Sequence, residues 1–450
     1  MKKVYFIGIG GIGMSALARW FKFKGYAVAG YDRTPSDLTR ELEAEGIPVH
    51  YEDRPELIPT DVENTLVVYT PAIPDELGEM KAVRAGGYNV VKRSQILGEI
   101  TSGQKCLAVA GTHGKTTTST LVAHILTVSG EGCSAFLGGV SRNYGTNLLM
   151  SHNPVAVAEA DEFDRSFLRL HPAIAAITAM DADHLDIYGD LEHVQEAYRQ
   201  FASQVSEVLV HKLGLPLAPD VTSAKMLTYA LDDPRADFHA SNLRLGPDGH
   251  YTFDLVHPGG IIKDIRTGTL GKLNVENAVA AAAICLCHGT AEDAIRKAIG
   301  SYLGAHRRLE EYVNTPSLTF LDDYAHHPAE LEASIRTVRD IFPGRKLTAI
   351  FQPHLYTRTR DFAPEFAHAL SLCDQVVLLD IYPAREEPIP GVTSEIIYKD
   401  VTAPEKVLLR YDELLDWVAG ATDVNVLVTF GAGNIDRLVE PIAEILRKRV

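Results

Sequence analysis

The sequence predicts an α/β protein with about three domains. Its 450 residues exceed what one hydrophobic core usually supports. Short apolar runs alternate with helical patterns along most of the chain, which is typical of helices that cover a mostly parallel sheet. One apolar run, residues 106–110, leads into a glycine-containing turn and a helix that opens on Gly-Lys-Thr. Such a strand, turn and helix indicate a phosphate-binding loop.

The composition is that of an ordinary globular protein, with 46% hydrophobic and 23% charged residues. A formal net charge of −16 argues against a general binder of nucleic acid or of anionic membranes. Five cysteines without zinc-like spacing fit reduced thiols. Glycines interrupt the apolar N-terminus, which suits a tight turn better than a secretory signal, and no apolar run approaches the roughly 18 residues of a membrane span. We therefore expect a cytoplasmic protein without membrane insertion.

The first strand is expected at residues 3–7, and the pattern G-x-G-x-x-G follows it as Gly8-Ile9-Gly10-Gly11-Ile12-Gly13. A helical pattern comes next, and a second expected strand, residues 26–31, ends at Asp32. In such a unit the glycines let the backbone approach a pyrophosphate, and an acidic residue about 20 positions later contacts a ribose. A nicotinamide or flavin cofactor, a different nucleotide and a turn without any ligand all remain open.

Two further strands are expected at residues 66–69 and 89–91. Thr70 directly follows the first of them, at the carboxyl end of a parallel strand, where ligands collect. A helix is expected at residues 94–100, and a polar break at residues 101–104 separates it from the next domain.

The phosphate loop itself is Gly111-Thr112-His113-Gly114-Lys115-Thr116-Thr117. Backbone N–H groups at the start of its helix face an anion, Lys115 adds a mobile positive charge and Thr116 offers a hydroxyl to Mg²⁺. Only two residues separate the glycines, whereas the general pattern has about four. A glycine turn that merely precedes a helix therefore stays an alternative.

Polar residues also follow the next expected strands. Glu159-Ala160-Asp161-Glu162 comes after the run 154–158, where a carboxylate downstream of a phosphate loop is expected to bind magnesium; a solvated acidic turn is the alternative. His184 lies among aspartates after the strand expected at residues 173–178, and is either a hydrogen-bonded loop residue or a ligand. Asn274 and Asn277, spaced i, i+3, can face one ligand or cap a helix.

A third α/β domain is expected after a junction at residues 304–310, which contains Arg308. Its strands are expected at residues 318–321, 347–351, 376–379, 407–409 and 426–429. The first two run into dense polar clusters, Asp322-Asp323-Tyr324-Ala325-His326-His327-Pro328 and Gln352-Pro353-His354-Leu355-Tyr356-Thr357-Arg358-Thr359-Arg360-Asp361. Such clusters are unfavourable for stability alone, so a site is favoured over a plain loop.

With these pieces placed, the chain resembles the Mur ligases over nearly its whole length, and most closely their alanine-adding branch. The resemblance is carried by residues 6–14, 111–118, 159–162, 182–184, 274–277, 307–308, 323–328 and 351–354. In this family the phosphate loop is itself the short form. The resemblance implies a Rossmann-like domain for a UDP-substrate at residues 1–98, a central P-loop ATPase domain at 99–305, and a C-terminal Rossmann-like domain at 306–450 that closes over ATP and binds the amino acid.

The resemblance also implies a reaction, in which ATP drives amide formation between UDP-N-acetylmuramate and L-alanine through an acyl phosphate during peptidoglycan synthesis. The first glycine loop, with Asp32 and Thr70, would then hold the UDP part of the substrate in place of a redox cofactor. Lys115 would contact the phosphates of ATP. Thr116 and Glu159 would hold one Mg²⁺, and His184 a second.

The remaining roles are implied in the same way. Arg308 would neutralise charge that develops during phosphoryl transfer, and His326, His354 and Arg358 would orient the amino acid. Contacts with ATP are implied for Gly111, Thr112, His113, Gly114, Thr117, Asn274, Asn277, Asp323 and Tyr324.

Several features bear on the alternatives. No lysine occurs between Asp181 and His211, which favours the alanine-adding branch, because later-acting Mur ligases use a carbamylated lysine there. Leu355 stands where several relatives carry arginine. A recycling Mur ligase that attaches a preformed tripeptide shares much of the pattern, although residues 164–168 resemble the alanine-adding version. A nicotinamide-dependent dehydrogenase would leave Lys115 and Glu159 without purpose, and a non-catalytic, nucleotide-switched binding protein is the third class. We expect a monomer or a homodimer.

Overall fold

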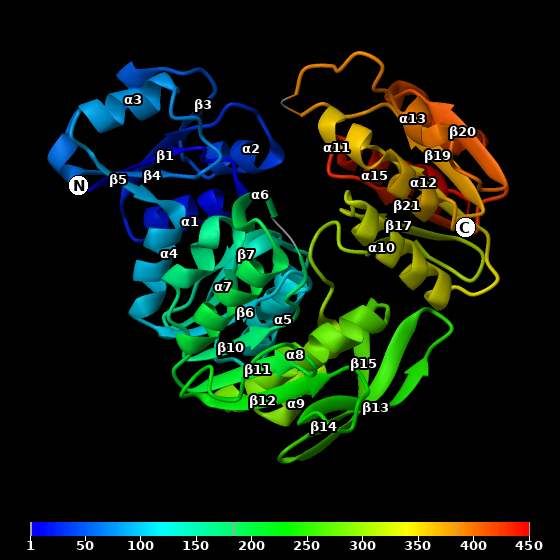
Figure 1. The fold of residues 1–450 in the computed structure, drawn as a ribbon, viewed down its shortest axis with the longest axis horizontal. Coiled ribbons are helices and arrows are strands. Elements are labelled where there is room, and N and C mark those ends of the chain that lie inside the picture. Colours follow the sequence, from blue (N-terminus) through cyan, green and yellow to red (C-terminus); the bar gives the residue numbers. More distant parts are fainter. Residues whose placement is uncertain (1, 183–184, 385, 450) are drawn as a thin grey trace. The chain divides into compact units, whose positions relative to one another are not determined.

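The structure is a computed structural model that describes residues 2–182, 185–384 and 386–449. Within these residues the strands form three sheets, of five, ten and six strands, and helices connect many of the strands (Figure 1). The chain divides into two compact units. The first comprises Met1–Asn242, Phe253–Gly268 and Val275–Ala305, and the second Leu243–Thr252, Thr269–Asn274 and His306–Val450. The expected α/β class with three domains is confirmed.

The first sheet is entirely parallel and has the order β3-β2-β1-β4-β5. Because the order turns back at β1, the carboxyl ends of β1 and β4 are neighbours, and ligands bind at such a point in open α/β sheets. The two-residue strand β3 is too short to show a period, and the sequence did not predict it. The elements are β1 (Lys3–Ile7), α1 (Ile12–Phe23), β2 (Ala27–Tyr31), α2 (Asp37–Ala44), β3 (Val49–His50), η1 (Pro55–Leu57), η2 (Val62–Asn64), β4 (Thr65–Tyr69), α3 (Gly78–Ala85), β5 (Asn89–Lys92) and α4 (Arg93–Ser102).

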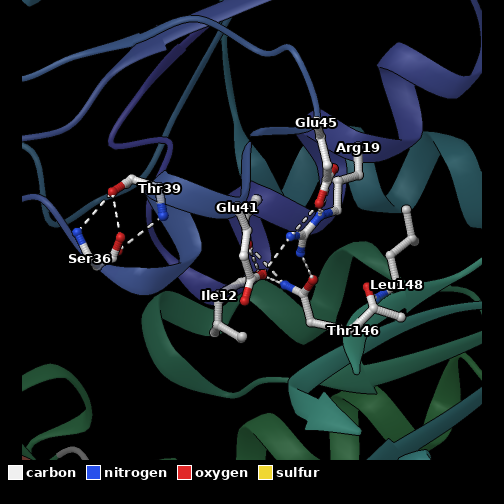
Figure 2. Close-up of polar contacts among 10 residues, drawn as sticks. Ile12, Arg19, Ser36, Thr39, Glu41, Glu45, Thr146 and Leu148 are labelled. Carbon is white, nitrogen blue, oxygen red and sulfur yellow. Dashed lines mark hydrogen bonds and ion pairs between the residues drawn. The ribbon is translucent and has the colours of Figure 1, made fainter. Parts of the chain in front are cut away.

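Local sequence explains where the first helices begin and which face they bury. α1 starts directly after the glycine pattern and buries Met14, Leu17 and Phe21, which are spaced as one helical face. α2 starts with a capping box, in which Ser36 and Thr39 exchange hydrogen bonds between side chain and backbone (Figure 2).

The second sheet has the order β15-β14-β13-β12-β11-β10-β6-β9-β7-β8. Strand β6 lies between β10 and β9 and is parallel to both. It is buried on both faces, as its uninterrupted apolar sequence indicates. The elements are β6 (Lys105–Ala110), α5 (Lys115–Val128), β7 (Ser134–Ser141), β8 (Thr146–Leu149), β9 (Val155–Ala160), η3 (Phe163–Arg169), β10 (Ile174–Ile177), α6 (Leu185–Tyr188), α7 (Leu191–Ser203), β11 (Val208–Lys212), β12 (Lys225–Ala230), β13 (Phe238–Leu245), β14 (His250–His257), β15 (Gly260–Leu270), α8 (Lys272–His288) and α9 (Glu292–Ser301).

The first sheet and the β6–β10 part of the second share one hydrophobic core within the first unit. A single cluster of buried side chains contains Phe6 and Leu17 from one and Ala108 and Phe201 from the other. Helix α1 packs against β7 and β8, and α4 packs against η3 and β6. The two layers therefore form one body, and their ligand-binding edges have a defined geometry.

The third sheet belongs to the second unit and has the order β16-β17-β21-β18-β19-β20, in which only the edge strand β16 is antiparallel. Separate apolar clusters cover its two faces. The elements are β16 (Glu310–Asn314), β17 (Thr319–Asp323), α10 (Pro328–Ile341), β18 (Leu347–Phe351), α11 (Tyr356–Asp361), α12 (Ala363–Leu370), β19 (Gln375–Leu379), α13 (Glu395–Tyr398), β20 (Glu405–Leu409), η4 (Tyr411–Glu413), α14 (Leu414–Gly420), β21 (Val426–Phe430) and α15 (Asp436–Arg447). Among the described residues, no helix has the length and apolar character that crossing a membrane requires.

Candidate functional site

The expected phosphate loop connects β6 to α5. Gly114 caps α5 with a φ of 79°, and Gly111 has a φ of 134°, both in the region that favours glycine. A Cβ atom on Gly111 would lie 2.0 Å from Oγ1 of Thr178. Glycine is therefore required at position 111 both by its backbone angle and by its neighbour.

The end of β10 supports this loop from the side. Thr178 donates its hydroxyl to the carbonyl oxygens of Ala110, at 3.1 Å, and of His113. Thr112 donates its N–H to the carbonyl of Ala179 at 3.3 Å, and its hydroxyl accepts the N–H of Asp181 at 3.2 Å. These backbone and side-chain hydrogen bonds fix the conformation of the loop and the position of the start of α5.

Two more loop residues have partners at the periphery of the site. Nε2 of His113 lies 3.3 Å from Oδ2 of Asp181, and both side chains are exposed. The carbonyl of Thr117 accepts the hydroxyl of Tyr302 at 3.1 Å.

Lys115 is the first residue of α5, and its ammonium group is held inside the loop. Nζ donates to the carbonyl of Gly111 at 2.7 Å and to Oε1 of Glu162 at 2.8 Å. Burial by itself would lower the pKa of Lys115, but the carboxylates of Glu162 and Glu159 outweigh it and hold the pKa above its usual range. The lysine is a cation at any physiological pH.

Thr116 and Glu159 meet beside the lysine. The hydroxyl of Thr116 donates to Oε1 of Glu159 at 3.2 Å, and the N–H of Gly138 donates to Oε2 of the same carboxylate at 3.1 Å. A Cβ on Gly138 would lie 2.2 Å from that carboxylate, so β7 approaches it more closely than any other residue type would allow. β9 continues to Ala160, and Glu159 is therefore a strand residue instead of the first residue of a turn.

A hydroxyl at the start of a helix and a carboxylate near the end of a strand are oxygen ligands of the kind that Mg²⁺ prefers, together with substrate phosphates. Thr116 and Glu159 therefore fit a magnesium ion that also binds a nucleotide. Among the described residues, no group of three or more histidine, cysteine or acidic side chains is gathered so that it could hold a metal by itself. His184, the expected ligand of a second ion, lies outside the described residues.

The first glycine pattern forms a tight turn between β1 and α1. Gly8 has a φ of 90°, and a Cβ on it would lie 2.8 Å from Cγ2 of Thr70, at the end of β4. Gly10 donates its N–H to Oδ2 of Asp32 at 2.8 Å, and Thr34 donates to Oδ1 at 3.1 Å. The carboxylate of Asp32 thus holds the turn through backbone bonds.

A cavity of about 360 Å³ extends from this turn to Glu159. Its wall includes Gly11, Ile12 and Gly13 from the turn, Thr70 from the end of β4, and Glu159 from β9. The structure therefore places Glu159 and the first glycine turn around one space. The other residues that line it are Met14, Ala16, Leu17, Pro71, Arg93, Leu97, Phe136, Leu137, Gly138, Asp161, Phe163 and Ser166.

The start of α1 is fixed by a residue from the second sheet. Asn147, which is fully buried on β8, donates from Nδ2 to the carbonyl of Ile12 and to the hydroxyl of Ser15, the latter at 2.9 Å. Its Oδ1 accepts Nη1 of Arg19 at 2.6 Å.

Arg19 is in turn held by ion pairs with Glu41 at 2.8 Å and Glu45 at 2.7 Å, and Figure 2 shows both carboxylates converging on its guanidinium. The first glycine turn, α2 and the β7–β8 hairpin are thereby connected through polar side chains, of which Asn147 is buried and Glu41 and Glu45 are exposed.

The two asparagines of α8 have different surroundings. Oδ1 of Asn277 accepts the hydroxyl of Thr118 at 3.4 Å and would lie 2.6 Å from a Cβ on Gly114, so Asn277 lies against the phosphate loop. Asn274 belongs to the second unit and donates its side-chain amide to the carbonyl of Leu270 at 2.8 Å.

The second unit gathers the other expected residues. Of the arginine pair, Arg307 is the less exposed member, and its Nε donates to Oδ2 of Asp322 at 2.9 Å. Arg308 places its guanidinium 5.5 Å from the ring centre of Tyr324, and Arg307 lies 5.3 Å from the same ring. Both distances are those of cation–π contacts.

Asp323, which directly precedes Tyr324, is buried. Its two oxygens accept the N–H groups of Leu309 and Ala325 at 2.9 and 2.8 Å. Burial raises the pKa of Asp323 to about 6, although the positive charge of Arg308 opposes the shift. The carboxylate therefore holds the junction and the following loop together.

A row of aromatic and cationic side chains continues from Tyr324. The ring centres of Tyr324 and His326 are 5.0 Å apart, and those of His326 and His354 are 6.1 Å apart. Nη1 of Arg358 lies 3.3 Å from Nδ1 of His354. The expected residues Arg308, Tyr324, His326, His354 and Arg358 thus form one contiguous cluster, although they come from three separate segments.

The surroundings keep His326 neutral near pH 7. Burial lowers its pKa; the Glu330 carboxylate opposes this and the charge of Arg358 adds to it. Nδ1 of His326 lies 3.0 Å from the carbonyl of Tyr324, so the ring has a defined orientation. A neutral, oriented imidazole can accept a proton.

Sequence reasoning missed several residues that surround the site. Glu162 belongs to the acidic segment that the sequence indicates, but its contact with Lys115 was not predicted. Gly138, Arg93 and Asn147 each contact an expected residue, yet none carries a motif that identifies its partner. Arg93 alone had a usable signal, because it directly follows β5, where parallel strands present ligand-binding residues.

Comparisons with known proteins cover the whole chain. Family models match three consecutive stretches: the Mur ligase family, catalytic domain, over residues 3–105; the Mur ligase middle domain over residues 109–285; and the Mur ligase, glutamate ligase domain, over residues 307–433. UDP-N-acetylmuramate–L-alanine ligase of Parabacteroides distasonis is 51% identical, with 99% of this chain and 98% of that protein covered. The protein of the same name from Porphyromonas gingivalis is 49% identical, with 99% of each chain covered.

Solved structures agree. UDP-N-acetylmuramate-alanine ligase from Thermotoga maritima superimposes with a TM-score of 0.84 and 25% identity over 100% of both chains. A murein peptide ligase from Psychrobacter arcticus gives a TM-score of 0.69 over 99% of both chains; at 20% identity this similarity shows the fold alone.

Proposed function

The chain belongs to the Mur ligase family, and from this premise we propose that it joins L-alanine to UDP-N-acetylmuramate at the expense of ATP, in peptidoglycan synthesis. The relatives named above carry that activity in their names. The observation that supports it best is the 360 Å³ cavity, whose wall contains both the first glycine turn and Glu159. A sugar nucleotide bound at the turn would extend toward the phosphate loop.

The chemistry explains why the two sites adjoin. A carboxylate is anionic and has no good leaving group, so an amine does not attack it at a useful rate. Transfer of the γ-phosphoryl group of ATP converts it into an acyl phosphate, which the uncharged amine of alanine attacks. Donor and acceptor are both anions, and the protein must supply cations and hold the reacting oxygens in line.

In this proposal Lys115 binds the terminal phosphates of ATP at the loop, in exchange for its present contact with Glu162. Thr116 and Glu159 hold Mg²⁺, which supplies positive charge between the phosphates and the substrate carboxylate. Asn277 lies against the phosphate loop and is proposed to face the nucleotide that the loop binds. His184 is proposed as a ligand of a second ion on the basis of the family motif alone.

The cluster of the second unit serves the nucleotide and the amino acid in this proposal. Tyr324 and Arg308 present an aromatic face and a cation suited to adenine and phosphate. Arg358 pairs with the carboxylate of alanine, His354 helps to orient its amine, and the neutral imidazole of His326 accepts its proton. Asn274 and Asp323 are also proposed to contact the nucleotide, and this proposal rests only on the family motifs in which they occur. We also propose that the enzyme acts in the cytoplasm, where ATP is available.

The test is phosphate release and product mass with UDP-N-acetylmuramate, ATP and Mg²⁺, and with L-alanine, L-serine, glycine or a muramyl tripeptide as acceptor. We expect the greatest kcat/KM with L-alanine and a product heavier than the sugar nucleotide by one alanyl group. Turnover with the tripeptide alone would assign the chain to the recycling branch. Chelation of magnesium should stop the reaction, and added Mg²⁺ should restore it.

A further inference from the structure

The cavity between the first glycine turn and Glu159 has an unusual charge balance. Among the described residues that line it, Arg93 is the only basic one, and Glu159 and Asp161 are acidic. The substrate proposed above carries a diphosphate and a carboxylate. In a chain of net charge −16, an anion enters such a cavity only where positive charge is presented to it locally.

Arg93 is held in the wall of this cavity with its two terminal nitrogens in different surroundings. Nη2 donates to Oδ2 of Asp161 at 3.3 Å, and the side chain is 21% exposed. Nη1 lies 2.5 Å from the position that a Cβ on Gly13 would occupy. A guanidinium has a planar fork of five N–H donors, so one nitrogen can keep the carboxylate while the other serves a ligand.

The position of Nη1 also explains Gly13. In the general dinucleotide-binding pattern the third glycine allows a helix to pack closely on a strand. Here the three nearest atoms to an added Cβ all belong to the Arg93 side chain, at 2.5–3.2 Å. Gly13 therefore makes room for an arginine, next to backbone N–H groups at the start of α1, which is where a diphosphate binds in such turns.

We propose that Arg93 binds the diphosphate of the UDP-substrate, through the nitrogen that lies against Gly13, while Nη2 stays bonded to Asp161. The inference rests on the proposed function and names the side chain that supplies the positive charge. The diphosphate is favoured over the substrate carboxylate because Nη1 lies next to Gly13 of the glycine turn, whereas Nη2 is bonded to Asp161, which directly follows β9. Arg93 thereby connects the sugar-nucleotide site to the acidic segment that contains Glu159 and Glu162.

The experiment measures binding instead of turnover. The affinities of UDP and of UDP-N-acetylmuramate are determined by calorimetry for the full chain and for Arg93→Gln, without ATP or alanine. Loss of a charged contact to phosphate should weaken both ligands by a similar factor, about 10- to 100-fold. Arg93→Lys, which keeps the charge but not the fork, should recover part of the loss.

Lys92→Gln is the matched control, because Lys92 is the neighbouring cation, pairs with Asp164 at 2.7 Å and does not line the cavity. Its UDP affinity should stay within about twofold of the unmutated protein. The thermal midpoint of each variant checks that folding is intact.

A second variant addresses the fit between Arg93 and Gly13. Gly13→Ala should weaken UDP binding, and it should do so much less in the Arg93→Gln background, because the added methyl group acts by displacing the guanidinium. Unchanged UDP affinity in Arg93→Gln would overturn the proposal, and so would a loss confined to UDP-N-acetylmuramate, which would assign the arginine to the carboxylate. If the unmutated protein bound no UDP at all, the proposed function itself would fail.

Discussion

Nζ of Lys115 lies 2.8 Å from Oε1 of Glu162, and the two side chains are only 15% and 1% exposed. The other carboxylate oxygen of Glu162 has no hydrogen-bond partner within the described residues. The charge of the loop lysine is thus already matched by a buried anion. A nucleotide phosphate that binds to the loop must compete with that carboxylate for the same ammonium group.

Replacement of the lysine should stop ligation without affecting the sugar-nucleotide site. We expect Lys115→Ala to reduce kcat by about 10³-fold or more, because no other group at the start of α5 supplies a mobile positive charge to the transferred phosphoryl group. UDP affinity should change by less than about twofold. Phosphate release and calorimetry measure the two quantities. Lys105→Ala, which removes a lysine from the other end of β6, is the control and should leave both unchanged.

Removal of the charge from Glu162 should make the stability of the folded protein depend more strongly on bound nucleotide. Glu162→Gln leaves the Lys115 ammonium without its buried counter-charge, which should lower the free energy of unfolding by roughly 2–4 kcal/mol. ATP should then raise the thermal midpoint of the variant more than that of the unmutated protein, because phosphate replaces the missing anion. Equal shifts in the two proteins would show that Glu162 and the nucleotide do not share the lysine.

The fold was largely readable from the sequence because its signals are local. The strand, glycine turn and helix around Lys115 are consecutive in the chain, and the same is true of residues 3–21. Short apolar runs followed by helical patterns identified most strands of the five- and six-stranded sheets, but fewer of the ten-stranded sheet, where β7, β8, β11, β12 and β15 were not predicted. The polar clusters at the ends of β17 and β18 were visible for the same reason, since parallel strands present their ligands at one edge.

The contacts that complete the site were not readable, because they join segments that only tertiary structure brings together. Asn147 and Ile12 are 135 positions apart, and Arg93 and Asp161 are 68 positions apart. No sequence pattern in either segment identifies the segment that it contacts. The sequence also could not say that Arg307 is the less exposed member of the arginine pair, or that both oxygens of Asp323 accept backbone N–H groups.

The Asn147 side chain should matter for both stability and substrate binding. Asn147→Ala removes one hydrogen bond each from the Ile12 carbonyl, the Ser15 hydroxyl and the Arg19 guanidinium, and we expect a loss of about 1–3 kcal/mol in the free energy of unfolding. Because Ile12 begins the helix at the glycine turn, the KM for UDP-N-acetylmuramate should rise while the KM for ATP stays close to its original value. Urea denaturation and initial rates test this. Asn153→Ala, in the loop that precedes β9, should change neither.

Asp323 should leave a signature in the pH dependence of stability. Its pKa is raised by burial to about 6 in the folded protein, above the value of about 4 expected in the unfolded chain. Between these two values the folded state keeps a proton that the unfolded state has lost, so the stability contributed by this group is full below about pH 4 and falls as pH rises toward 6. A difference of two pH units corresponds to roughly 3 kcal/mol.

The measurement is the free energy of unfolding of the unmutated protein and of Asp323→Asn, from urea titrations at several pH values between 4 and 8. The stability of the unmutated protein relative to the variant should decline from pH 4 to 6 and then stay level, because the amide that replaces the carboxyl group in the variant carries no titrating proton. Asp412→Asn, at an aspartate that is 71% exposed in the same unit, should show no such decline. A constant difference across the whole range would mean that the pKa of Asp323 is the same in the folded and unfolded states, so that its bonds to Leu309 and Ala325 and the charge of Arg308 offset the effect of burial.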